Sequence, residues 1–157
     1  MAKRLAFLVF AAVAALSGPA RSAEEASPVA RWEADHSVIL NGAEVTLSDF
    51  HWIARPLVVF ADSPADPRFQ QQMDLLTARL NELAERDVVV IVDTDPDAKS
   101  EPRITLRPRG FMLALMAKDG NVLFRKPLPW DVREIGRSID KLPLRQQEIR
   151  DRRALTQ

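Results

Sequence analysis

The sequence predicts one α/β domain in which helices cover both faces of a mixed central sheet. Two unbroken apolar runs, residues 57–61 and 88–92, have the composition of strands that are buried on both faces. An amphipathic helical segment separates them, and a pair of strands with a tight turn, then a further helix, follows them. The 157 residues suit one domain rather than two.

The N-terminal 23 residues have the features of a secretory signal peptide. Lys3 and Arg4 precede an unbroken apolar run, residues 5–16. This run is shorter than the about 20 apolar residues that a membrane-spanning helix needs. We therefore expect a periplasmic or secreted protein with no membrane span after cleavage. The cleavage position stays open among the small residues Ala20, Ser22 and Ala23.

The composition excludes one class of function and argues against a second. The chain contains no cysteine, so it cannot perform thiol–disulfide exchange, and its core must be stable without disulfide bonds. Lys plus Arg and Asp plus Glu both number 22, so the chain lacks the basic excess that is typical of nucleic-acid binding. We expect neither thiol redox activity nor a nucleic-acid partner.

The polar residues 24–36 predict a flexible leader before a folded domain at residues 37–143. The domain is expected to begin with a β-hairpin, in which residues 37–40 and 43–47 flank Asn41-Gly42. This pair favours the positive φ angles of a type I′ turn.

A strand–helix–strand unit follows. Asp66 suits an N-cap and Pro67 the first helical position. One helix is expected to run from there to residue 86, because apolar residues recur at helical spacing. They are Phe69, Met73, Leu76, Leu80 and Leu83. A unit of this length places its two strands, residues 57–61 and 88–92, parallel with a right-handed crossover.

Residues 93–110 are rich in proline and charge and predict a loop or at most a broken helical turn. Residues 111–116 and 122–126 then flank Asp119-Gly120, a second hairpin signal. Asp131 and Glu134 match the capping box of a last helix, which Pro143 interrupts. Residues 144–157 predict a charged tail or a short helix. A βαβ unit, a loop and a ββα unit form the minimal thioredoxin-like arrangement, here preceded by the expected hairpin.

Four segments in this order resemble the P-DUDES family of extracytoplasmic domains, whose bacterial members form domain of unknown function 4174. The segments are residues 52–61, 85–90, 110–120 and 139–146. The resemblance covers about residues 46–150. It implies a thioredoxin-like fold, export, no established activity and no catalytic residues to carry over. Vertebrate relatives are matrix-associated, which implies binding by analogy of fold alone.

The segment after the first central strand is where a thioredoxin carries its redox pair. Here it holds Asp62, Ser63 and Asp66, none of which can exchange disulfides. The N–H groups of the helix, with Ser63 and Arg68, could hold an anion. We favour the alternative, that Asp66 caps the helix and repels an anion.

Asp93 and Asp95 follow the second parallel strand, at the sheet edge where α/β proteins bind ligands, and Asp62 should lie nearby. Such carboxylates could bind Ca²⁺ or Mg²⁺. We favour a solvated acidic turn instead and predict no metal and no cofactor.

The sequence therefore predicts a non-catalytic binding module whose partner is another envelope or extracellular protein. One alternative is a divalent-metal-assisted enzyme that uses Asp62, Asp66, Asp93 and Asp95. A second alternative is a structural envelope protein. The sequence leaves the partner and the oligomeric state open.

Overall fold

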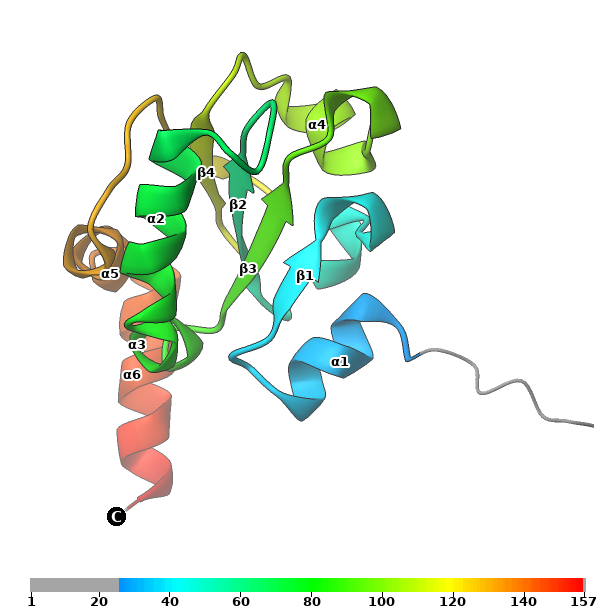
Figure 1. The fold of residues 1–157 in the computed structure, drawn as a ribbon. Helices are drawn as coiled ribbons and strands as arrows, with labels where there is room; N and C mark the ends of the chain where they lie inside the picture. Colours follow the sequence, from blue (N-terminus) through cyan, green and yellow to red (C-terminus); the bar gives the residue numbers. More distant parts are fainter. Residues whose placement is uncertain (1–25, 157) are drawn as a thin grey trace, which may run out of the picture.

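A five-stranded mixed sheet lies between two layers of helices in the computed structural model, which describes residues 26–156 (Figure 1). The predicted signal peptide, residues 1–23, lies outside the described residues. Within the described part, no helix has both the length and the apolar character that crossing a bilayer requires.

The sheet has the strand order β1-β3-β2-β4-β5. The strands are β1 (Ile39–Asn41), β2 (Arg55–Phe60), β3 (Val88–Asp93), β4 (Met112–Met116) and β5 (Val122–Lys126). β2 and β3 are parallel neighbours, with Leu57 opposite Val90, so the predicted strand–helix–strand unit is confirmed. β5 runs antiparallel to β4, as the second hairpin signal predicted, and β4 runs antiparallel to β2.

Side chains of β2 alternate between two apolar clusters, because successive residues of a strand point to opposite faces. Leu57 and Val59 belong to the cluster formed with α2 (Pro67–Thr77), α3 (Leu80–Ala84) and α5 (Val132–Asp140). Val58 and Phe60 belong to the cluster formed with α1 (Pro28–Ala34) and α4 (Glu101–Leu106). Helices therefore cover both faces, as predicted (Figure 1).

The predicted first hairpin is wrong. β1 pairs in parallel with β3, and Asn41-Gly42 begins a 3₁₀ helix, Gly42–Glu44. The Asn41 side chain accepts a hydrogen bond from the backbone N–H of Ala43 at 2.9 Å, so Asn41 caps a helical turn. Its backbone does not adopt the positive φ that a type I′ turn would need. A Cβ at position 42 would lie 2.9 Å from the Asp93 Cβ, so this close approach requires glycine.

The predicted flexible leader is wrong for residues 28–34, which form α1. The Ser27 hydroxyl oxygen caps this helix by accepting from the N–H of Ala30 at 3.2 Å. Trp32 is only 2% exposed and packs into the core. The ordered structure therefore begins before residue 37.

Three other predictions change in detail. The long helix predicted to end at residue 86 divides into α2 and α3. The Thr77 hydroxyl donates back to the Met73 carbonyl at 2.8 Å, a bond that bends helices.

The segment 93–110, predicted as a loop, contains the helix α4. The predicted C-terminal tail or short helix forms α6 (Pro143–Leu155), which is 13 residues long.

Candidate functional site

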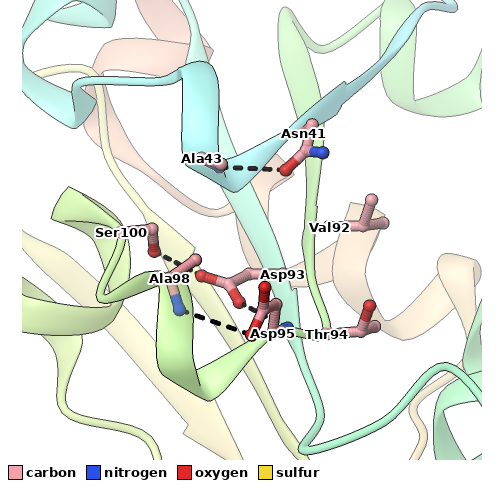
Figure 2. Close-up of a pocket in the computed structure, with 8 residues that line it drawn as sticks. All are labelled: Asn41, Ala43, Val92, Asp93, Thr94, Asp95, Ala98 and Ser100. Atoms are coloured by element: carbon pink, nitrogen blue, oxygen red, sulfur yellow. Dashed lines mark hydrogen bonds between the residues drawn. The ribbon is translucent and has the colours of Figure 1, made fainter.

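The carboxyl ends of β1 and β3 border a pocket of about 130 Å³. Figure 2 shows the side chains that line it, with Asp93 at its centre between Ser100 and Asp95. The Asp93 side chain lies here because β3 ends at this residue, one strand away from the sheet edge.

Asp93 is buried and its carboxylate is fully engaged. It accepts a hydrogen bond from the Ser100 hydroxyl (Figure 2). It also accepts from Arg103, with Oδ1 2.8 Å from Nη2 and 3.1 Å from Nε. Both guanidinium contacts meet the same carboxylate oxygen, and hydrogen bonds between two ionised groups are stronger than those between neutral ones. This carboxylate therefore has its charge balanced inside the protein.

Arg103 also joins the ends of the two parallel strands. Its Nη2 donates to the carbonyl oxygen of Ala61 at 2.9 Å and to that of Asp93 at 3.1 Å. Its Nη1 lies 3.7 Å from Asp62 Oδ1. Arg103 thus fills the space between the predicted candidates Asp62 and Asp93 with positive charge.

The loop between β2 and α2 satisfies its own polar groups. The Ser63 hydroxyl oxygen accepts from the N–H of Ala65 at 3.1 Å. Asp66 accepts from the N–H of Arg68 at 2.8 Å, so the predicted N-cap is confirmed. The Arg68 guanidinium lies 3.2 Å from the same carboxylate. Its hydrogen bond lowers the pKa of Asp66, which therefore keeps a negative charge where an anion would have to bind.

Asp95 lies at the rim of the pocket and caps a short 3₁₀ helix, Pro96–Ala98. Its Oδ1 accepts from the N–H groups of Asp97 at 3.0 Å and Ala98 at 3.3 Å. The structure thus brings Asp62 and Asp93 together around Arg103, while Asp66 and Asp95 serve as separate caps. Across residues 26–156, no three potential ligand side chains converge in a way that could hold a metal ion.

Sequence reasoning missed Ser100 and Arg103, because the segment around them was expected to be a loop. A signal for them exists: Ser100 is followed by Glu101-Pro102, the typical order of an N-cap and the first helical turn. Ser100 Oγ does accept from the N–H of Arg103 at 3.2 Å. The helical turn then places the Arg103 side chain against β3.

A comparison with solved structures finds the Plasmodium yoelii peroxiredoxin Prx1a, modified at its N-terminus, with a TM-score of 0.51. The two sequences are 20% identical, and the match covers 66% of this chain and 82% of the other. The likeness shows a thioredoxin-like fold. No curated protein matches the chain in sequence. The family model described as Domain of unknown function (DUF4174) matches residues 46–148, close to the range that the sequence resemblance predicted.

Proposed function

The chain belongs to the DUF4174 family, and from this premise we propose that it is a non-catalytic binding module that acts in the periplasm or outside the cell. Its partner in this proposal is another envelope or extracellular protein. The surface that meets the partner is the end of the sheet where β2 and β3 finish.

The observation that supports binding rather than chemistry is the state of the polar groups at this end of the sheet. Nucleophilic and acid–base catalysis need a reactive side chain that is free to meet a substrate. Asp93 is held by Ser100 and Arg103. Asp66 caps α2, and the chain contains no cysteine. The groups that a thioredoxin-like fold offers for chemistry are thus absent or engaged.

Two neighbouring loops make up the proposed contact surface. The first is the loop between β2 and α2, residues 61–66. The second is residues 107–111, which lead into β4. The loops lie together, because a Cβ built on Gly110 would be 3.9 Å from Asp62 Oδ2. The Arg68 guanidinium also lies 5.6 Å from the centre of the Phe111 ring.

A photo-crosslinking experiment tests the binding proposal. A photoreactive amino acid is placed at Ser63 or at Arg109, both exposed, in cells that naturally make the protein. A matched control carries it at Gln147, an exposed position on α6. We expect one crosslinked partner from positions 63 and 109 and none from 147. If all three positions give no crosslink, or the same crosslinks, the proposal fails.

Location is tested separately. The proposal rests here on the basic residues, apolar run and small residues of positions 1–23. Cell fractionation followed by N-terminal sequencing should find a mature chain that begins after Ala20, Ser22 or Ala23, outside the cytoplasm. An uncleaved chain in the cytoplasmic fraction would contradict it.

A further inference from the structure

Three arginines surround a second pocket, of about 270 Å³, beside the loops described above. Arg107 and Arg109 come from the segment between α4 and β4, and Arg125 comes from β5. Buried Phe111 and Met112 also line the pocket. We call the site formed by these five residues the arginine pocket.

Within the described part of the chain, the three arginines have no carboxylate partner. Most arginines of the described chain form salt bridges, as Arg55 does with Glu148 at 2.9 Å. Among residues 26–156, no salt bridge involves Arg107, Arg109 or Arg125, and no acidic residue lines the arginine pocket. The whole chain has a formal net charge of zero, so this positive charge is a local concentration.

The backbone fixes the positions at which Arg107 and Arg125 leave the chain. Arg107 ends α4 in the left-handed conformation, with φ +51°, and its N–H bonds to the Arg103 carbonyl at 2.9 Å. Arg125 lies in the β4–β5 ladder opposite Ala114. Lys126, which also lines the pocket, places its ammonium group 4.3 Å from the centre of the Trp130 ring.

We infer that the arginine pocket binds an acidic segment of the partner protein, through Asp or Glu side chains. The inference rests on the proposed function and adds the chemistry of the partner. Guanidinium groups pair with carboxylates through two parallel hydrogen bonds, and the apolar floor of Phe111 and Met112 accommodates the methylene groups of the acidic side chains.

An extended peptide fits this place better than a small ion does. β5 is the last strand of the sheet, so its outer edge faces no further strand within the described residues. An exposed edge can pair with an extended segment of another protein, while side chains along the strand select the sequence. Arg125 on this strand would favour acidic residues.

The test measures binding of a fluorescent polyglutamate peptide by anisotropy at low and at high salt. The test variant is Arg107→Gln/Arg109→Gln/Arg125→Gln. The control, Arg133→Gln/Arg150→Gln/Arg153→Gln, removes the same charge from three exposed arginines that form no salt bridge with any residue the structure describes. We expect the test variant to weaken the Kd about tenfold or more, and the control to leave it nearly unchanged. Salt should weaken binding to the wild type.

Parallel measurements use inorganic phosphate and phosphatidylglycerol vesicles. If phosphate displaces the peptide when both supply the same concentration of negative charge, the pocket is a small-anion site and the inference is overturned. Vesicle binding that needs the three arginines, without peptide binding, would indicate a membrane surface and also overturn it. An equal loss of peptide binding in the two triple variants would also overturn the inference. So would a wild-type protein that does not bind the peptide.

The crosslinking experiment separates this inference from the proposed function. With the photoreactive residue at Ser63, the triple arginine variant should lose the crosslinked partner. If the partner is retained at an unchanged yield, the binding module stands and the acidic-segment inference fails. If wild type captures no partner, the proposed function fails, while the peptide measurement still decides whether the arginine pocket recognises carboxylates.

Discussion

Arg103 on α4 lies over the carboxylate of Asp93 at the end of β3, with Nη2 2.8 Å from Oδ1. The same nitrogen donates to the Ala61 carbonyl, so one side chain links α4 to the ends of both central parallel strands. Asp93 is 4% exposed, which makes its carboxylate dependent on this partner. The pair therefore stabilises the surface that the proposed function uses.

Replacing Arg103 by methionine should destabilise the protein by about 3–5 kcal/mol, because it leaves a buried charge without its partner. Urea unfolding measures the change, with Arg133→Met, at an exposed position of α5, as the control. In Asp93→Asn/Arg103→Met the loss should be smaller than the sum of the single losses, since both variants remove the same interaction. Additive losses would show that the two side chains are not coupled.

Glu148 should make stability depend on pH. Burial favours its neutral form, but hydrogen bonds from the side chains of Arg55 and Lys118 outweigh this and hold the pKa of Glu148 below its ordinary value of 4.5. A lowered folded-state pKa contributes stability above the unfolded-state pKa, and this stability is lost as the pH falls through the folded-state value.

Comparison of wild type with Glu148→Gln by urea unfolding, from neutral pH down to about pH 3, tests this dependence. The glutamine variant should be less stable near neutral pH, because the fully buried Arg55 loses its carboxylate partner. The difference between the two proteins should shrink as the medium becomes acidic. If the difference in the free energy of unfolding stays constant over this range, the pKa of Glu148 is not lowered by folding.

Two of the three tryptophans, Trp32 and Trp52, should differ in how much stability their truncation costs. Trp32→Ala removes a side chain that is 2% exposed, and we expect a loss of about 3–5 kcal/mol in the free energy of unfolding. Trp52 is 70% exposed and has a φ of +63°, so Trp52→Ala should change stability by less than about 1 kcal/mol. A small loss for Trp32→Ala would mean that α1 is not part of the folded core.

Divalent cations should leave the thermal stability unchanged. Arg103 neutralises Asp93, and Asp66 and Asp95 cap separate helical turns. A ligand that binds only the native state raises the melting temperature. We therefore expect the same Tm with millimolar Ca²⁺, Mg²⁺ or Mn²⁺ as with a chelator, by differential scanning fluorimetry. A rise that Asp93→Asn abolishes would restore the metal hypothesis.

The parts of the fold that follow from local patterns could be predicted. The apolar runs of β2 and β3 and the Asp119-Gly120 turn depend on neighbouring residues, and the structure has them in the expected places. Gly120 has a φ of +86°, which such a turn requires. The Asp66 cap was equally local, because its hydrogen bond joins residues two positions apart.

The missed elements depend on contacts between distant residues. Asn41-Gly42 can form a turn or cap a helix, and the pairing of β1 with β3 selects the cap. α1 is held by the burial of Trp32, and α6 by the pair of Glu148 with Arg55, which are 93 positions apart. Neither contact leaves a periodic signal in the sequence.

The amino-acid sequence by itself determined that thiol chemistry is impossible and that two buried parallel strands form the centre of the domain. An absent sulfur atom is a matter of composition, and a buried strand is a matter of local hydrophobicity. Only the tertiary structure decided which charges are engaged and which are free. The charge of Asp93 is balanced by Arg103, while Arg107 and Arg125 meet at a pocket that no carboxylate of residues 26–156 lines. Folding sets these distances, because it brings together residues that the chain keeps apart.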